Sequence, residues 1–381
     1  MKVVVPKEPQ SEARAPLTPT AAEKLVKLGM EVEVESGLGV QAGFADADFE
    51  AIGASVSPSV ERALSQADIV LRLNRPAVEA VRTLKAGAVH VSFLDPFHSP
   101  GLVGALASQQ VSAFCMELIP RTTYAQKMDA LSSQASLAGY VAVILAARRL
   151  DKALPMMSTP AGTIAPARVF VVGAGVAGLQ AIATAKRLGA VVEAYDTRPV
   201  VEEEVRSLGA RFVKIDVGEI GQDEQGYAEA LTEEQLASQR QQMKRYCANA
   251  DVVITTAQVF GKPAPRIITA DMVAAMRPGS VVVDLGAASG GNVEGTKLDE
   301  EVVQGGVRII GLSNYAAEVC RDAAQMYASN ATHLIEHLWD NEAQTLKLDL
   351  SDPVVASALL THQGEIRHPD IKQLASSHVN A

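Results

Sequence analysis

One short glycine motif constrains the fold of this chain more than any other feature. Gly173, Gly175 and Gly178 form a G-x-G-x-x-G directly after the strand-like run 167–172 and before an apolar, helix-like stretch. In such a strand–turn–helix unit the first glycine allows a tight turn, the second lets backbone N–H groups approach a pyrophosphate, and the third lets helix and strand pack closely. The placement predicts a Rossmann-type βαβ unit that binds a dinucleotide.

An acidic residue ends the next predicted strand. Asp196 stands where a carboxylate can accept hydrogen bonds from the hydroxyls of an adenosine ribose. A 2′-phosphate there would meet like charge, so the position favours NAD(H) over NADP(H), although Arg198 offsets part of that repulsion. The alternative, a Rossmann-like unit whose glycine turn holds no nucleotide, stays open as the less favoured interpretation.

The rest of the chain alternates short Val-rich runs with amphipathic stretches, which is typical of a mostly parallel sheet covered by helices. The first helix is expected from about Thr20, since Thr20 and Glu23 have capping-box spacing. Expected strands lie at 2–5, 31–35, 69–73, 89–93 and 113–116, and then at 167–172, 191–195, 211–215, 252–255, 281–285 and 307–310. We therefore predict an α/β fold with two doubly wound Rossmann-like domains and a nucleotide cleft between them.

The length of 381 residues also predicts two domains. A long helical stretch at 126–150 is followed by a break in the pattern at 155–166, which places a boundary nearby. The segment from 345 onward is too small to fold alone and is expected to pack back on the first domain. The predicted domains are 1–138 with 327–381, and 139–326.

Composition excludes several classes of protein. The net charge of −10 argues against binding a phosphate backbone. The cysteines are an odd, widely spaced trio, so neither a disulfide framework nor a metal site is expected: Cys115, Cys247 and Cys320. The longest uncharged apolar run, 137–147, is shorter than the roughly 20 residues that a bilayer-spanning helix needs. No signal-peptide pattern opens the chain, so a cytoplasmic location is expected.

A polar cluster follows a predicted strand of the first domain, at the edge where α/β sheets bind ligands. Its members are Arg121, Tyr124, Gln126, Asp129 and Ser132. Such a cluster can orient a nicotinamide through its ribose and carboxamide without proton chemistry. An equally compatible interpretation is that the Arg and the Asp satisfy each other beside a helix N-terminus. His90 and His98, which flank Asp95, lack metal-ligand spacing and are expected to be structural.

An acidic, glycine-bearing insertion at 216–231 contains one aromatic residue, Tyr227. Beside a nucleotide cleft such a segment is either a solvated connection or a lid that closes on the bound cofactor. The residues alone leave both possibilities open.

Three stretches closely resemble the NAD(H)-binding domain of proton-translocating nicotinamide nucleotide transhydrogenases. They are MELIPR (116–121), MDALSSQASLAGY (128–140) and GAGVAGLQAIATAKRLGA (173–190). The match covers essentially the whole chain and is most similar to the bacterial form in which this domain is a separate soluble alpha subunit. It implies a homodimer that joins a membrane-spanning subunit and an NADP(H)-binding domain at the inner face of the cell membrane. It also implies Re/Si-specific hydride transfer directly between two nicotinamides, coupled to proton translocation.

The resemblance also implies roles for individual residues and no metal. It places Arg121, Gln126, Asp129 and Ser132 around the nicotinamide as the catalytic set. The cofactor-binding set is Thr122, Thr123, Tyr124, Gly173, Gly175, Val176, Gly178, Asp196, Thr197, Arg198, Gly226, Tyr227, Gln239, Thr256, Ala257 and Gln258. In this scheme Tyr227 matches the tyrosine of a mobile loop that closes over NAD(H), which favours the lid interpretation of the insertion.

Alanine dehydrogenase shares this fold, and the opening 6–8, Arg14 and 17–19 would suit either family. Where alanine dehydrogenases carry a substrate-binding lysine and a catalytic histidine, this chain has Asn74 and Asp95. An amino-acid dehydrogenase needs a cation for the carboxylate and a general acid/base with a near-neutral pKa, which favours the transhydrogenase. A catalytically silent NAD-sensing module is the third possibility.

Overall fold

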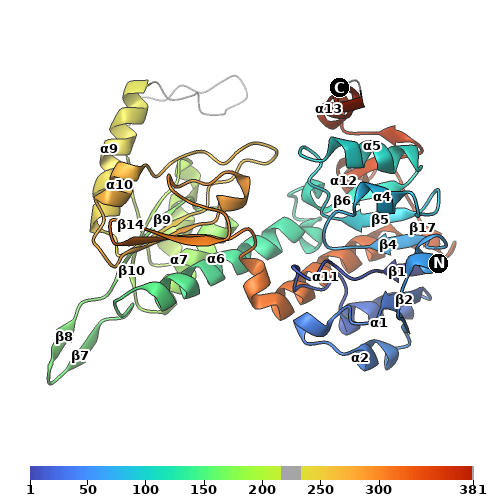
Figure 1. The fold of residues 1–381 in the computed structure, drawn as a ribbon, viewed down its shortest axis with the longest axis horizontal. Helices are drawn as coiled ribbons and strands as arrows, with labels where there is room; N and C mark the ends of the chain where they lie inside the picture. The colour runs from blue at the N-terminus through green and yellow to red at the C-terminus, as the bar shows by residue number, and fades with distance from the viewer. Residues whose placement is uncertain (216–232, 380–381) are drawn as a thin grey trace. The chain divides into compact units, whose positions relative to one another are not determined.

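The computed structural model describes residues 1–215 and 233–379, which form two compact units (Figure 1). The first unit comprises residues 1–134 and 319–381, and the second comprises 135–318. The segment after 318 therefore returns to the first unit, as expected for the tail. The long helix α6, Ala130–Arg149, begins in the first unit and continues in the second.

The first unit is built on a sheet whose described strands number eight, in the order β19-β18-β6-β5-β4-β1-β2-β3. The strands are parallel except β18 and β19, which are antiparallel to their neighbours. Their bounds are β1 Lys2–Val5, β2 Glu31–Glu35, β3 Ser55–Ser57, β4 Ile69–Leu71, β5 Val89–Ser92, β6 Ser112–Cys115, β18 Leu359–His362 and β19 Glu365–Ile366; β16 Trp339–Asp340 and β17 Thr345–Leu346 form a separate ladder. The helices are α1 Pro19–Lys27, α2 Asp46–Glu50, α3 Glu61–Leu64, α4 Val78–Val81, α5 Pro100–Ser108, α11 Cys320–Leu338, α12 Pro353–Ala358 and α13 Pro369–Val379, with 3-10 turns η1 Val40–Ala42, η2 Met116–Leu118 and η3 Gln126–Met128.

The second unit has a sheet of seven described strands in the order β11-β10-β9-β12-β13-β15-β14, parallel except β14. Their bounds are β9 Arg168–Val172, β10 Val191–Tyr195, β11 Arg211–Phe212, β12 Val252–Thr255, β13 Val281–Asp284, β14 Glu300–Gln304 and β15 Val307–Gly311, and a separate hairpin consists of β7 Met157–Thr159 and β8 Gly162–Ile164. The helices are α7 Val176–Arg187, α8 Glu202–Ser207, α9 Glu233–Asn249 and α10 Ala270–Ala274, with 3-10 turns η4 Pro199–Val201, η5 Ala287–Ser289 and η6 Ala316–Val319.

Alternate residues of the central strands feed cores on opposite faces of each sheet, because successive side chains of a strand point to opposite sides. In β1, Val3 and Val5 pack with α1 and α11, whereas Val4 packs with α3 and α5. All four residues of β12 are buried, and so are all four of β13. Strands covered by helices on both faces are continuous apolar runs, so this burial pattern is what makes both units doubly wound.

The fold-class prediction is confirmed, since each unit holds a mostly parallel sheet covered by helices. The predicted start of α1 was wrong: Thr18 is the N-cap, Pro19 takes the first helical position, and no side chain caps the helix. Proline suits that position because its missing N–H is one of the unpaired donors of the first turn. The pattern break at 155–166 contains the hairpin β7–β8, and the units divide within α6 and after residue 318 rather than at 138 and 326.

Among the residues that the structure describes, α6 has the length and apolar composition of a membrane-crossing helix. It has 20 residues and a mean hydropathy of 1.5, and 33% of its most apolar window is buried within the protein. Core helices of globular proteins share these properties, so length and composition alone are weak evidence for a membrane span.

Candidate functional site

The turn between β9 and α7 separates the three motif glycines by what surrounds them. Gly173 has φ +100°, and a Cβ added to it would lie 2.4 Å from Thr256 Oγ1. A Cβ on Gly178 would lie 1.9 Å from the carbonyl oxygen of Gly173. Gly175, by contrast, has no described atom within 4 Å of its Cβ position. The packing of the protein itself thus requires glycine at 173 and 178, while the space beside Gly175 is open.

The first turn of α7 borders this open space. Gly175 is the N-cap of the helix in an extended conformation, and no side chain caps it. Val176, the first helical residue, is 45% exposed. The unpaired N–H groups and the helix dipole of such a terminus attract an anion. The turn therefore offers both room and hydrogen-bond donors for a pyrophosphate.

Asp196 follows β10, and its carboxylate is almost buried. It accepts hydrogen bonds from the N–H of Ala174 at 2.7 Å and from the N–H, Nε and Nη2 of Arg198 at 2.8, 3.0 and 3.0 Å. Burial acts to raise the pKa of Asp196, but the hydrogen bonds from Arg198 and Ala174 outweigh it, so the pKa lies below its usual range. Since a carboxylate has about four acceptor positions, Arg198 occupies those that a ribose would use.

The loop after β12 completes this edge of the sheet. β10 and β12 flank β9 in the sheet, so the segments that follow the three strands meet at one edge. Thr256 Oγ1 donates to the carbonyl of Gly173 at 3.2 Å, and Gln258 Nε2 donates to the carbonyl of Leu285 at 2.6 Å. Ala257, beside them, accepts a hydrogen bond from Asn292 through its carbonyl. On α9, Gln239 donates to the Tyr195 hydroxyl at 2.7 Å. The structure thus brings together most of the predicted cofactor set of the second unit; Thr197 is exposed beside it.

One residue of this edge was missed from sequence. Asp284, at the end of β13, is fully buried. It accepts from the hydroxyl groups of Thr255 and Thr296 and from the backbone N–H groups of 286, 292 and 293. A buried carboxylate with this many donors fixes the loop that supports Ala257 and Gln258. An aspartate directly after a Val run was the available sequence signal.

The first unit carries the predicted nicotinamide cluster on one segment, and its residues fall into an exposed group and a bonded pair. The side chains of Arg121, Thr122, Thr123, Tyr124 and Gln126 are exposed. Asp129 accepts hydrogen bonds from the Ser132 N–H at 2.9 Å and from the Ser132 hydroxyl at 2.6 Å, and it precedes α6. The helix-terminus alternative holds in part, because Asp129 serves the start of α6, but its partner is Ser132 and not Arg121.

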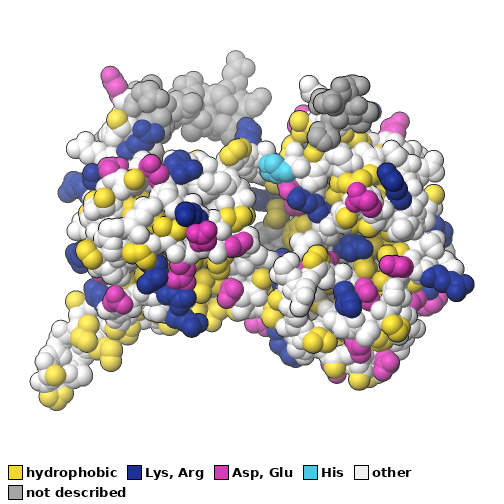
Figure 2. Space-filling model, viewed as in Figure 1, with side chains coloured by type: hydrophobic (Ala, Val, Ile, Leu, Met, Phe, Trp, Pro, Cys, Tyr) yellow, Lys and Arg dark blue, Asp and Glu magenta, His cyan; other side chains and the backbone are white. Residues whose placement is uncertain are grey.

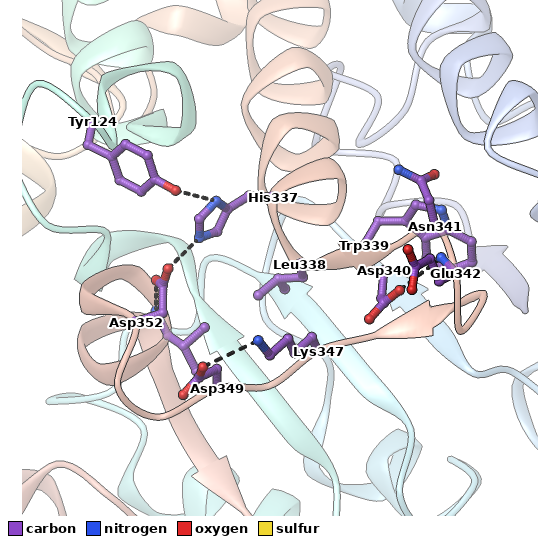
Figure 3. A pocket seen from close by; sticks show the side chains of 11 residues that line it. Tyr124, His337, Leu338, Trp339, Asp340, Asn341, Glu342, Lys347, Asp349 and Asp352 are labelled. Carbon is purple, nitrogen blue, oxygen red and sulfur yellow. Dashed lines mark hydrogen bonds and ion pairs between the residues drawn. The ribbon is translucent and has the colours of Figure 1, made fainter.

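Tyr124 belongs to a hydrogen-bonded chain that sequence analysis did not find. Its hydroxyl lies 3.2 Å from His337 Nδ1, and His337 Nε2 lies 3.0 Å from the Asp352 carboxylate, as Figure 3 shows. The chain borders a cavity of about 510 Å³. The cavity is lined by Tyr124, His337, Leu338, Trp339, Asp340, Asn341, Glu342, Lys347, Asp349, Asp352 and Val355. Among the described residues no group of His, Cys, Asp and Glu could hold a metal ion.

The sheet edge of the first unit is filled by its own charged groups. Glu12 holds Arg14 with two hydrogen bonds, from Nε at 2.8 Å and Nη2 at 2.7 Å, and Gln134 accepts from Nη1 at 2.8 Å. Asn74 donates its side-chain amide to Glu8 and Glu12. Arg14 and Asn74 are therefore committed to partners within the protein.

Asp95 and the histidines have separate surroundings. Asp95 has φ +46° and pairs with Arg75 at 2.5 Å and with His98 at 2.7 Å. His90 is fully buried, and burial together with the charge of Arg72 lowers the pKa of His90 to about 3. His90 is therefore neutral in the core, in agreement with a structural role. The predicted lid residues Gly226 and Tyr227 lie outside the described residues.

A glycine turn between the first strand and helix of a parallel sheet, with an acid after the next strand, defines the second unit as a Rossmann-type nucleotide-binding module. The family model described as alanine dehydrogenase/PNT, N-terminal domain, matches residues 4–138, and its C-terminal counterpart matches residues 142–369. The chain belongs to the alanine dehydrogenase/PNT family.

Within this family the chain is more similar to transhydrogenases than to alanine dehydrogenases. It is 42% identical to the first of the polypeptides that make up NAD(P) transhydrogenase subunit alpha in Rhodospirillum rubrum, over 97% of this chain and 98% of that protein. Alanine dehydrogenase of Halomonas elongata is 30% identical over 97% and 95%. The crystal structure of a transhydrogenase from Sinorhizobium meliloti superposes with a TM-score of 0.85 at 41% identity, covering 96% of this chain and all of that one. The resemblance drawn from the sequence motifs is confirmed.

Proposed function

We propose that this chain is the NAD(H)-binding subunit of a proton-translocating transhydrogenase. Hydride passes between NAD(H) bound here and NADP(H) on a partner domain, with Re/Si stereospecificity, and a membrane partner couples the transfer to proton translocation. The observation that carries the proposal is the turn at Gly173–Gly178, where the one motif glycine that the protein's own packing does not require, Gly175, faces open space. A dinucleotide pyrophosphate accounts for that glycine.

The proposed cofactor site extends from this turn in both directions. The pyrophosphate lies on the first turn of α7 beside Gly175 and Val176, with Thr256, Ala257 and Gln258 on the neighbouring loop. The adenosine ribose lies at Asp196, flanked by Thr197 and Arg198. Because Arg198 fills the acceptor positions of Asp196 but its side chain is 58% exposed, binding requires that the guanidinium swing away from the carboxylate. Gln239 supports the wall of this site through Tyr195.

The proposed reaction needs no acid or base from this chain. A hydride, one proton with two electrons, leaves C4 of one dihydronicotinamide and joins C4 of the other ring, so that one nicotinamide is oxidised and the other reduced. No proton is released in that step. The contribution of Arg121, Gln126, Asp129 and Ser132 is then to hold the ring in a reactive position. The exposed side chains of Arg121 and Gln126 are free to reach a ligand, and the Asp129–Ser132 pair fixes the end of their segment.

Alanine dehydrogenase activity is the less supported alternative. That reaction needs a cation for the substrate carboxylate, and the hydrogen bonds to Glu12 and Gln134 already occupy Arg14. Asn74 supplies no charge, and Asp95 is paired with Arg75 and His98. We expect no ammonia-dependent oxidation of NADH with pyruvate. Turnover at an enzyme-like rate of about 1 to 1,000 per second would establish the alternative instead.

A homodimer is included in the proposal and is supported by the hairpin β7–β8. Its six residues are all exposed, and the large apolar side chains there and just before it are Met156, Met157 and Ile164 at 66%, 47% and 49% exposure. Figure 2 shows hydrophobic side chains along the projecting hairpin. An isolated two-stranded hairpin is marginally stable in water, so a second copy is the expected support. Light scattering at micromolar concentration tests this, with Ile164→Asp expected to weaken the dimer.

The remaining partners follow from the proposed role. The subunit would be cytoplasmic and peripheral on the inner face of the cell membrane, where it joins a membrane-spanning subunit and an NADP(H)-binding domain. The test is to mix this chain with the NADP(H)-binding domain of a transhydrogenase and to follow reduction of an NAD analogue by NADPH. Reduction that depends on both proteins supports the proposal. NADH binding without any transfer would indicate an NAD-sensing module.

A further inference from the structure

We propose that His337, oriented by Asp352, is a positioning residue that holds the segment 121–126 through the hydroxyl of Tyr124. The proposal deepens the proposed function and rests on it for its catalytic consequence, because that segment carries Arg121 and Gln126. Its structural basis concerns contacts within the first unit only.

The segment needs an external support because its own structure is slight. Between η2 and η3 its described backbone hydrogen bonds are turns, from Thr122 to Pro120 at 2.9 Å and from Ala125 to Thr122 at 3.0 Å. Ala125 is fully buried, which anchors the end of the turn. Tyr124 is 64% exposed, so burial of its ring does not hold it in place.

Helix α11 contacts the segment at two points along one face. Asn330 donates to the carbonyl of Lys127 at 2.7 Å and accepts from the Ser133 hydroxyl at 2.7 Å. His337 meets the Tyr124 hydroxyl at 3.2 Å. Residues seven apart on a helix share a face and are separated by about 10 Å, which is two turns. Asn330 thus fixes the C-terminal part of the segment, and His337 fixes its centre.

The hydrogen-bond order follows from the partners of His337. Asp352 is an acceptor, so Nε2 of His337 carries the proton that it donates at 3.0 Å, and the unprotonated Nδ1 accepts from the Tyr124 hydroxyl. The two rings also meet edge to face, with centroids 5.3 Å apart and planes at 79°. Asp352 is itself fixed, because it accepts from the N–H groups of Val354 and Val355 as the N-cap of α12. The chain Asp352–His337–Tyr124 (Figure 3) therefore connects a capped helix to the exposed segment.

Two substitutions isolate this connection. Tyr124→Phe removes the hydroxyl and keeps the ring, and because the side chain is exposed it leaves the fold intact. His337→Asn shortens the link while Asp352 continues to cap α12. The matched control is His333→Asn, one turn earlier on α11, since the described polar contacts of His333 are with Ser329 and Glu336.

The experiment measures amide hydrogen exchange of residues 120–126 in the full chain without cofactor. Loss of one hydrogen bond should raise exchange there about fivefold in Tyr124→Phe and His337→Asn, with no change in His333→Asn. Wild-type exchange in Tyr124→Phe overturns the proposal, whether or not the chain transfers hydride. Hydride transfer is then measured with an NADP(H)-binding domain: the two variants should slow single-turnover transfer while leaving NADH affinity within about twofold. If wild-type protein transfers no hydride, the proposed function is wrong, and the exchange data still decide the positioning role.

Discussion

The two units share a doubly wound architecture but fill the carboxyl edges of their central strands in opposite ways. In the second unit β9 leads into a glycine turn with open space beside Gly175. In the first unit β1 leads into a segment whose Glu8 accepts from the N–H groups of Leu73 and Asn74, and whose Glu12 holds Arg14. Burial raises the pKa of Glu8, and the hydrogen bonds to it offset this only in part. The same fold thus yields a ligand site where side chains are missing and a closed polar network where they are present.

The largest expected effect comes from filling the open edge of the second unit. Gly178→Ala places a methyl group 1.9 Å from the Gly173 carbonyl oxygen, so strand and helix must move apart. Overpacking of this kind costs about 1 to 3 kcal/mol, and we expect a lower Tm. Displacing the turn should also weaken NADH binding by about a hundredfold, equal to about 2.7 kcal/mol. Calorimetry and fluorescence titration measure the two effects.

Gly175→Ala is the matched control for that variant. Its Cβ meets no described atom within 4 Å and the backbone is extended, so the free energy of unfolding should change by less than about 0.5 kcal/mol. NADH affinity should nevertheless fall, because the methyl group enters the space assigned to the pyrophosphate. Unchanged affinity would mean that no nucleotide lies on this turn, and the two sheet edges would then not differ in function.

The second prediction concerns the contribution of the first unit. Gln126→Asn shortens the side chain by one methylene and withdraws its amide from the nicotinamide. A displacement of about 1 Å can slow a reaction about a hundredfold, so single-turnover transfer should fall on that scale while NADH affinity stays nearly constant. A loss confined to affinity, or unchanged transfer, would remove Gln126 from the catalytic set and would leave the first unit without a demonstrated role.

A third prediction sharpens the account of cofactor choice at Asp196. Asp196→Asn keeps an acceptor for the Ala174 N–H but removes the charge, so the preference for NADH over NADPH should shrink by about tenfold. Arg198→Ala should widen the preference, but only about two- to fivefold, because its side chain is 58% exposed and solvent screens the ion pair. Direct titration with both nucleotides decides this. Equal dissociation constants in the wild-type chain would contradict the assignment.

The smallest expected effect is on the pH dependence of NADH binding. The pKa of Asp196 lies below its usual value of 3.8, so the carboxylate stays ionised as pH falls and would lose its charge only below that value. All seven histidines of the chain lie in the first unit. NADH affinity should therefore vary less than about twofold from about pH 5.5 to 8. A step near the usual histidine pKa of about 6.5 would show that a histidine of the first unit contributes to binding.

Local patterns predicted the regions of the molecule that local patterns determine. The bounds of β1, β2, β10 and β12 match the predicted strands, because each is a compact β-branched run. The glycine turn was likewise predictable, since its residues are consecutive and its conformation is dictated by the absence of Cβ atoms. The two units themselves followed from the repeated alternation of strands and helices.

Elements that depend on distant partners were missed. β14 has the polar sequence EEVVQ and exists because β15 pairs with it, and β18 pairs with β6 from far along the chain. The contact between Tyr124 and His337 spans 213 residues, and nothing in either neighbourhood marks it. The same holds for Arg14 and Gln134, whose hydrogen bond decides whether Arg14 is available to a ligand.

The central claim is that hydride moves directly from one nicotinamide to another without passing through this chain or the solvent. The most direct test uses NADPH carrying deuterium at the transferred C4 position, bound to an NADP(H)-binding domain, with NAD bound to this chain in ordinary water. Mass spectrometry of the NADH formed should show the deuterium fully retained. NADH that carries solvent hydrogen in place of the label would contradict the account and would require an acid/base group at the site.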